Sequence, residues 1–229
     1  MIDIVDFHSH ILPGADHGSA SVSESLDQLR LASARGIKRI ITTPHFYPDS
    51  HEVASFISRR GEAYNKLKAA LPDDSPDIKL GAEVLICEGI ENMPNLDKLF
   101  VFETSTLLLE LSYTDFQYSH VKSVSTLVSS GVDVVLAHAD RYPKENIARL
   151  LEVGARIQLN VDSLKSLFLP KHLKEWIISG RVIALGSDIH GRDQKAYRNF
   201  ATAVSRLSGY IDHIKEQSDI IWGKAGKQV

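Results

Sequence analysis

The sequence is poor in cysteine, tryptophan and methionine: its 229 residues include one Cys, two Trp and two Met. The single cysteine, Cys87, excludes a disulfide within the chain, and such scarcity is typical of a reducing compartment. No apolar run approaches the roughly 20 residues that a membrane-spanning helix needs. The N-terminal segment MIDIVDFHSH has the pattern of a strand rather than of a signal peptide. These absences predict a cytoplasmic protein without membrane insertion.

Neither sign of charge dominates the chain. It contains 26 Lys and Arg against 29 Asp and Glu, which gives a formal net charge of -3, and it has no long basic run. Nucleic-acid binding therefore has no support in the sequence. Hydrophobic residues make up 43% of the chain, as in ordinary globular proteins, and the length suits one sizeable core. Because no linker interrupts the pattern, we expect a single domain over residues 1–229.

Apolar runs alternate with amphipathic stretches along the whole chain. The strand-like runs are IDIVDF, IKRIITT, IKLGAEV, TLLLEL, VDVVLAH, ARIQLNV and RVIALGS. Their nearly continuous Val, Ile and Leu content is typical of strands buried on both faces, as in parallel sheets. Ser21 and Glu24 form a predicted capping box for the first helix. This repeated βα pattern favours an incomplete barrel of seven strands over an open doubly wound sheet.

Four glycines separate helical patterns from the strands that follow them. They are Gly36, Gly131, Gly154 and Gly180. Helices commonly end in a left-handed residue, which glycine adopts most readily. We therefore predict that these glycines end four of the helices.

Potential metal ligands follow almost every apolar run. The first predicted strand ends at His8 and His10, the second at His45, the third at Glu83, the fourth at Glu110, the fifth at His138, and the seventh at Asp188 and His190. In a parallel barrel the carboxyl ends of all strands meet on one face, where active sites form. Buried carboxylates need positive partners. The sequence therefore predicts a site for several ions such as Mn, Fe or Zn, which accept both imidazole and carboxylate.

Spacing and charge extend this prediction. Residues two apart in a strand point to the same side, so His8 and His10 can face one metal ion. Two or three divalent ions would balance or exceed the negative charge of the three carboxylates. Such a site attracts a phosphate dianion. Arg141, shortly after His138, is placed to bind phosphate oxygens in a bidentate manner, although it could instead pair with Asp140 or Glu145.

Several stretches resemble one family of phosphatases. They are DFHSHILPGADHG, GIKRIITTPHFYP, GAEV, LLLEL, LAHADRY, IQLNVDSL and GSDIHG, and they extend over most of the chain in the same order as in the family. The sequence is similar to the PHP (polymerase and histidinol phosphatase) family. Within it, the spacing is closest to the metal-dependent protein-tyrosine phosphatases of bacterial capsule and exopolysaccharide loci, the CpsB/YwqE type.

The resemblance implies a distorted (βα)7 TIM-like barrel with two or three divalent metal ions. Manganese is the expected metal, and iron, zinc, magnesium or cobalt are the alternatives. The implied activity is hydrolysis of phosphotyrosine on proteins by direct attack of a metal-activated hydroxide. The implied protein partner is a cognate bacterial tyrosine kinase of polysaccharide synthesis.

Transferred position by position, the resemblance makes the eight residues at the strand ends metal ligands and gives Arg141 a substrate-phosphate role. The family usually has a ligating acid in the first loop, where this chain has His17. We expect His17 to replace it, with Asp16 as the alternative. The family usually has a second arginine about five residues after the last histidine. In this chain that position is Lys195, and Arg192 lies nearby in the sequence. Either of these two residues is a candidate for the second phosphate contact.

Other functions remain open at this point. The nearest is a small-molecule phosphomonoesterase of the histidinol-phosphatase type. An amidohydrolase also begins with H-x-H, but it commonly has a bridging lysine after the fourth strand, where this chain has Glu110. A non-catalytic metal-binding module is the third alternative. A thiol-based tyrosine phosphatase is excluded, because the residue six after Cys87 is Met93 and the Cys-x5-Arg loop is missing.

Overall fold

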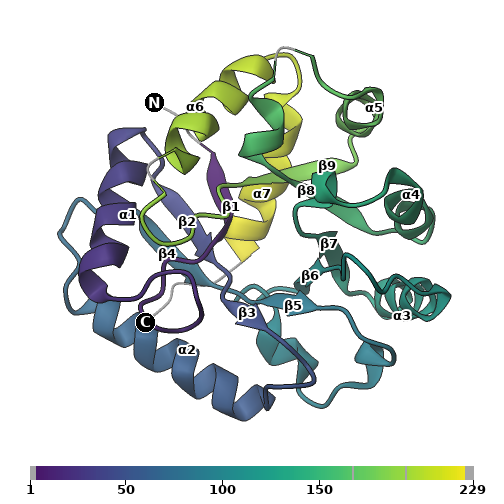
Figure 1. Ribbon diagram of the computed structural model, residues 1–229, viewed down its shortest axis with the longest axis horizontal. Coiled ribbons are helices and arrows are strands. Elements are labelled where there is room, and N and C mark those ends of the chain that lie inside the picture. Colours follow the sequence, from purple (N-terminus) through teal and green to yellow (C-terminus); the bar gives the residue numbers. More distant parts are fainter. Residues whose placement is uncertain (1–3, 167, 194, 225–229) are drawn as a thin grey trace.

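The structure, a computed structural model, describes residues 4–166, 168–193 and 195–224. These residues form nine short strands, all paired in parallel, and seven α-helices (Figure 1). The strands are β1 (Val5–Ser9), β2 (Arg39–Thr42), β3 (His45–Phe46), β4 (Asp77–Leu80), β5 (Glu83–Leu85), β6 (Thr106–Glu110), β7 (Asp133–Leu136), β8 (Arg156–Asn160) and β9 (Val182–Gly186). The helices are α1 (Val22–Ala34), α2 (Val53–Lys68), α3 (Tyr118–Ser129), α4 (Lys144–Glu152), α5 (Lys171–Ile178), α6 (Ala196–Arg206) and α7 (Ile211–Lys224). Residues 1–3, which include the start of the predicted first strand, lie outside the described residues.

The nine strands occupy seven positions, because the second predicted strand is divided into β2 and β3 and the third into β4 and β5. β2 pairs with β1 and β4, whereas β3 pairs with β5, and β5 pairs with β6. From β6 the pairing continues through β7, β8 and β9 and returns to β1. The pairing thus passes once around seven parallel strand positions in chain order. The predicted distorted barrel is confirmed.

Both divisions lie at residues that disrupt a strand. Pro44 precedes β3, and Gly81 follows β4. The buried Arg60 of α2 donates from Nη1 to the carbonyl oxygen of Gly81, at 2.6 Å, and holds the second break in place. As a consequence, His45 and Glu83 are the first residues of β3 and β5 and lie opposite each other in register. The sequence had placed these two residues at the last positions of longer strands.

Local signals for helix boundaries are borne out. The backbone N–H of Glu24 donates to Ser21 Oγ at 3.2 Å, so the Ser21 half of the predicted capping box forms at the start of α1. The Glu24 carboxylate accepts from the backbone N–H of Ala20 instead of that of Ser21, so the second half of the box is shifted by one residue. The four glycines predicted to end helices have φ values from 70° to 98°. These turns return the chain to the sheet after each helix.

Two hydrophobic clusters stabilise the barrel. The larger one lies between the strands and the surrounding helices. The smaller one consists of Val5, Phe7, Ile41, Val101, Leu108, Val135, Ala137, Ile183, Ala184 and Ile221. Because its strand residues come from β1, β2, β6, β7 and β9, this cluster fills the inside of the barrel.

Helix α7 closes one end of the barrel. It packs on β1 and β9 and lies behind the strands in the view of Figure 1. Asp219 of α7 pairs with Arg39, and Gln217 accepts from Arg156. Arg39 and Arg156 are the first residues of β2 and β8, so α7 covers the amino ends of the strands. Within the described residues, no helix has the length and apolar character needed to cross a membrane.

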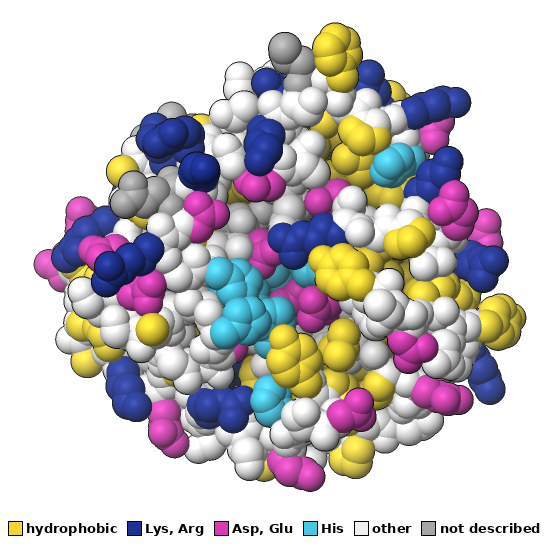
Figure 2. Space-filling view, viewed as in Figure 1, with side chains coloured by type: hydrophobic (Ala, Val, Ile, Leu, Met, Phe, Trp, Pro, Cys, Tyr) yellow, Lys and Arg dark blue, Asp and Glu magenta, His cyan; other side chains and the backbone are white. Residues whose placement is uncertain are grey.

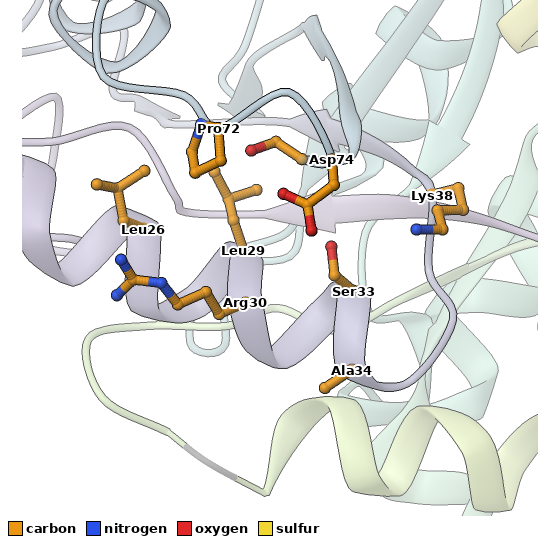
Figure 3. Close-up of a pocket in the computed structure, with 9 residues that line it drawn as sticks. Leu26, Leu29, Arg30, Ser33, Ala34, Lys38, Pro72 and Asp74 are labelled. Carbon is orange, nitrogen blue, oxygen red and sulfur yellow. The ribbon is translucent and has the colours of Figure 1, made fainter.

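A surface cleft of about 360 Å³ also lies at this end (Figure 3). It is lined by α1 and by residues 72–75, and it includes Lys38, which directly precedes β2. Figure 3 shows the side chains of Asp74 and Ser33 pointing toward each other across it. Because active sites of parallel barrels form at the carboxyl ends of the strands, this cleft is remote from the expected chemistry.

We predict that Ile221→Ala lowers the free energy of unfolding by about 2–4 kcal/mol, because Ile221 is 3% exposed and its removal leaves a cavity inside the barrel. Ile220→Ala is the matched control: the neighbouring residue on the same helix is 44% exposed and should change stability far less. Urea denaturation followed by circular dichroism measures both. Equal losses in the two variants would contradict the assignment of α7 as the barrel's closing helix.

Candidate metal centre

Eight side chains with metal-ligating atoms meet at the carboxyl ends of the strands. They form four overlapping groups, each with three ligand atoms within 4.8 Å of one another. The groups are His8–Glu83–His138, His8–His10–Asp188, His10–His45–His190 and His45–Glu83–Glu110. Figure 2 shows histidine side chains gathered in the middle of this face, with acidic side chains beside them. All eight residues that the sequence placed at strand ends are therefore brought together.

Glu83 is the centre of this cluster. Its side chain is 0% exposed, and its Oε1 lies 2.7 Å from His138 Nε2. Its Oε2 lies 2.9 Å from His45 Nδ1, 3.3 Å from His10 Nε2 and 3.6 Å from His8 Nε2. Burial acts to raise the pKa of Glu83, but the charge of His8 and the close approach of the other imidazoles hold it well below its usual range. The carboxylate is therefore ionised.

In two histidines, Nδ1 forms a hydrogen bond with a group that can only accept. His10 Nδ1 donates to Asp16 Oδ2 at 2.7 Å, and His190 Nδ1 donates to the carbonyl oxygen of Asp188 at 3.0 Å. Each ring thus carries a proton on Nδ1, so Nε2 is the atom available to a metal ion once it gives up any proton that it holds. Metal-ligating histidines show this arrangement, in which an outer partner fixes the tautomer.

Two further histidines repeat the pattern with hydroxyl partners. His8 Nδ1 lies 3.2 Å from Thr43 Oγ1, and His138 Nδ1 lies 3.1 Å from Tyr142 Oη. In both rings Nε2 is the atom that faces Glu83. Four of the five clustered histidines therefore direct Nε2 inward and Nδ1 outward.

The site favours positive charge. Burial lowers the pKa of His45, but Glu110 and Glu83 outweigh this effect and raise it to about 9. Burial and the positive charge of His10 lower the pKa of His190 to about 4, so this imidazole is neutral near pH 7. Hydrogen bonds with His10 and His8 hold the pKa of Asp188 far below its usual range, although burial acts in the opposite direction. Ionised carboxylates beside neutral imidazole are the donor set that divalent metal ions bind.

Three buried atoms of the cluster have no hydrogen-bond partner. They are His45 Nδ1, Glu83 Oε2 and His190 Nε2. His45 Nδ1 and Glu83 Oε2 are 2.9 Å apart but are not aligned for a hydrogen bond. Such orphaned buried donors and acceptors are costly unless another group satisfies them. Metal ions bound in the His10–His45–His190 and His45–Glu83–Glu110 groups would satisfy these atoms.

His138 and Asp188 adopt left-handed backbone conformations, with φ of 31° and 49°. Such values are strained for residues other than glycine, and they persist only when neighbouring contacts enforce them. The backbone N–H of His138 donates to Gln158 Oε1 at 2.7 Å. The backbone N–H of Asp188 donates to the carbonyl oxygen of His8 at 2.8 Å, and Asn160 Nδ2 donates to its carboxylate at 3.0 Å. These contacts hold both side chains in the site.

The first loop places Asp16 and His17 differently. The Asp16 carboxylate accepts from His10 Nδ1 and from the backbone N–H groups of Gly18 and His45. His17 is exposed, and its ring stacks against His45 and His190 at centroid distances of 4.7 and 4.8 Å. Among the described residues, His17 belongs to none of the four ligand groups. Gly18 is required here, because a Cβ atom would lie 2.3 Å from His10 Cβ.

Of the three positively charged residues predicted to bind phosphate, Arg141 contacts the cluster. Arg141 Nη2 is 2.5 Å from Asp188 Oδ2, so it pairs with that residue rather than with the neighbouring Asp140 or Glu145. Arg192 is 84% exposed and lies 4.0 Å from Glu24. Lys195 is exposed at the start of α6.

Sequence reasoning missed the outer partners. Neither Thr43 nor Tyr142 was identified from the sequence as a partner of a ligand histidine. Gln158 carried a recognisable signal: it is a polar residue in the middle of the buried run ARIQLNV. Asn160, the last residue of β8, donates to the Asp188 carboxylate. Cys87 belongs to none of the ligand groups, and burial raises the pKa of its thiol.

Comparisons with known proteins identify the family and the fold. The family model described as "Capsular polysaccharide synthesis, CpsB/CapC" matches residues 4–218. Tyrosine-protein phosphatase YwqE from Bacillus subtilis (strain 168) is 29% identical over 216 residues, which cover 87% of this chain and 81% of the relative. Tyrosine-protein phosphatase CpsB from Streptococcus agalactiae serotype V is 25% identical over 210 residues, which cover 83% of this chain and 84% of the relative.

A solved structure has the same fold. It comes from the crystal structures of YwqE from Bacillus subtilis and CpsB from Streptococcus pneumoniae, described as metal-dependent tyrosine phosphatases. It superimposes with a TM-score of 0.75 and 21% identity, covering 97% of this chain and 92% of the other. Because the family model extends over nearly the whole chain, this protein belongs to the CpsB/CapC family of capsular polysaccharide synthesis.

Proposed function

We propose that this protein is a metal-dependent phosphatase that hydrolyses phosphotyrosine on proteins. The observation that carries the proposal is the orientation of four histidines, whose Nδ1 atoms are engaged by outer partners. Nε2 of His8, His10 and His138 faces the buried Glu83, and Nε2 of His190 is buried without a hydrogen-bond partner. The relatives named tyrosine-protein phosphatases support the reaction class.

The eight clustered residues are the proposed metal ligands, for two or three divalent ions with manganese as the expected metal and iron, zinc, magnesium or cobalt as alternatives. We assign His17 as a further ligand at the rim, since its ring stacks on His45 and His190. Asp16 is assigned as a positioning residue, because its oxygens already accept three hydrogen bonds.

The residues around the cluster have complementary roles. When bound, the ions supply Lewis-acid chemistry, which lowers the pKa of a coordinated water and offsets the negative charge of the phosphoryl oxygens. Arg141, with its side chain 40% exposed beside Asp188, contacts those oxygens from the rim. Lys195 or Arg192 provides a second positive charge. No thiol participates, since the raised pKa of Cys87 keeps it protonated.

The family suggests the physiological setting. A match to capsular polysaccharide synthesis supports a cognate bacterial tyrosine kinase of that pathway as the phosphoprotein partner. We also propose a cytoplasmic location, which the single cysteine supports. The alternative is a small-molecule phosphatase of the histidinol-phosphate type. The activities on a phosphotyrosine peptide and on histidinol phosphate distinguish the two functions.

Protein stripped of metal by a chelator should hydrolyse a phosphotyrosine peptide only after manganese is restored. His138→Ala should then reduce kcat/KM by at least about 100-fold, because even outer partners of metal ligands are worth 10–100-fold. Phosphate release measures the activity, and circular dichroism checks the fold. His172→Ala, on α5, is the control and should retain activity.

Two outcomes of this experiment would contradict the proposal. Folded protein that binds manganese but releases no phosphate from any aryl ester would refute the phosphatase activity. A clear preference for histidinol phosphate over the peptide would favour the small-molecule alternative.

Asp16→Asn should weaken manganese binding by about 10–100-fold, because asparagine has one accepting oxygen and no charge. Asp16 uses both of its oxygens, one for His10 Nδ1 and the other for the backbone N–H of Gly18. Competition with a fluorescent chelator measures the affinity. Asp73→Asn is the matched control, since Asp73 is exposed in the turn before β4. Unchanged affinity in Asp16→Asn would show that this contact does not orient the ligand.

Arg141→Ala should lower kcat/KM for an aryl phosphate by about 10–100-fold, because it removes charge-assisted hydrogen bonds to the phosphoryl group. Arg141→Lys should restore only part of the activity, because lysine offers a point charge without the bidentate fork. Metal content is measured in parallel. If Arg141→Ala loses its metal to the same degree as its activity, Arg141 acts through Asp188 and the phosphate role is wrong.

A further inference from the structure

The buried metal centre is bordered by aromatic side chains. Side-chain exposure increases from 0% at Glu83 to 15% at Glu110 and 40% at Arg141. Tyr113, beyond them, is 62% exposed. Figure 2 shows hydrophobic side chains, a class that includes tyrosine, directly beside the histidine and acidic side chains. A substrate that enters this site therefore passes apolar surface before its charged group reaches the buried ligand residues.

Tyr47 forms one part of this border. It directly follows β3, so the same short strand positions Tyr47 and His45. Its ring lies 5.3 Å from the His45 ring, with an interplanar angle of 17°, and is half-buried. One face of a flat aromatic ring is thus fixed by stacking on a residue of the metal centre.

Tyr113 forms the other part, in the loop after β6. Its ring lies 5.2 Å from that of Tyr142, which in turn lies 5.5 Å from the His138 ring. Tyr142 directly follows Arg141, the proposed phosphate contact. The exposed ring of Tyr113 therefore packs against the buried ring of Tyr142, which contacts the metal centre through His138. We call Tyr47 and Tyr113 the aromatic rim.

Phosphate binding alone does not explain these rings. A phosphoryl group needs positive charge and hydrogen-bond donors, and aromatic faces supply neither. A large aromatic side chain such as Tyr113 normally loses much of its exposure on folding. Aromatic pairs gain free energy beyond their buried area when they stack or meet edge to face. The group that would use this surface is an aromatic ring attached to the phosphate.

We propose that the aromatic rim binds the phenyl ring of the substrate, and that Tyr47 and Tyr113 set the selectivity for aryl over alkyl phosphates. This inference rests on the proposed phosphatase function and names the part of the site that selects phosphotyrosine. Phosphoserine has no ring to contact the rim. Its short side chain would also bring the peptide backbone closer to the buried ligands.

Binding of non-hydrolysable ligands tests the rim independently of turnover. Calorimetry on the manganese-loaded protein compares phenylphosphonate with propylphosphonate, and kcat/KM is measured for phosphotyrosine and phosphoserine peptides. The variants are Tyr47→Ala, Tyr113→Ala and the two phenylalanine replacements. Tyr118→Ala is the control, because Tyr118 is 78% exposed at the start of α3.

The wild-type protein should bind phenylphosphonate more tightly than propylphosphonate. Each alanine variant should reduce that ratio about 2–10-fold, as expected for the loss of one aromatic pair. The phenylalanine variants and Tyr118→Ala should keep the ratio. Affinity for propylphosphonate and metal content should stay constant throughout, which excludes a general loss of structure.

Two results separate this inference from the proposed function. If the wild-type protein hydrolyses phosphotyrosine and the alanine variants keep full preference for the phenyl ligand, the rim is overturned while the phosphatase stands. If the ring preference is present and depends on Tyr47 and Tyr113 but no ester is hydrolysed, the rim is supported and the phosphatase is refuted. An equal loss of affinity for both phosphonates would also overturn the rim.

Discussion

The fully buried carboxylate of Glu83 is the constraint on which the rest of the site depends. An ionised carboxylate removed from water is costly unless positive charge and hydrogen bonds surround it. Here four imidazoles approach its two oxygens within 3.6 Å. Such an arrangement is stable only with cations at the centre, whether protons on the rings or metal ions. The same physical requirement explains both the lowered pKa of Glu83 and the suitability of the cluster for metal.

Holding the imidazoles around one carboxylate requires departures from regular structure. The division of two strands puts His45 opposite Glu83, and left-handed turns bring His138 and Asp188 into the site. Strain of this kind persists when surrounding contacts over-determine it. Gln158 and Asn160 provide such contacts from β8. At the opposite end, α7 and the apolar barrel interior supply stability that the polar end lacks.

From the buried ligands outward, the side chains of the site become more exposed and change from charged to aromatic. Its base is charged and buried, its middle carries Arg141, and its outer edge carries tyrosine rings. This order matches an aryl phosphate that enters with the phosphoryl group first. The half-buried Cys87 lies outside all four ligand groups of the described residues, so the chemistry resides in imidazole and carboxylate.

Patterns that are local in the sequence predicted much of this protein. Apolar runs gave the seven strand positions, glycines and the Ser21 cap gave helix boundaries, and polar residues after the runs identified all eight clustered side chains. This works because parallel strands place their carboxyl ends together whatever their exact register.

Long-range contacts decided the features that local sequence patterns do not contain. The opposition of His45 and Glu83, the pairing of Arg141 with Asp188, and the division of roles between Asp16 and His17 each depend on residues that are distant in the chain or on loop geometry. Side-chain direction and hydrogen-bond partners follow from packing in three dimensions, and residue type and spacing carry no record of them.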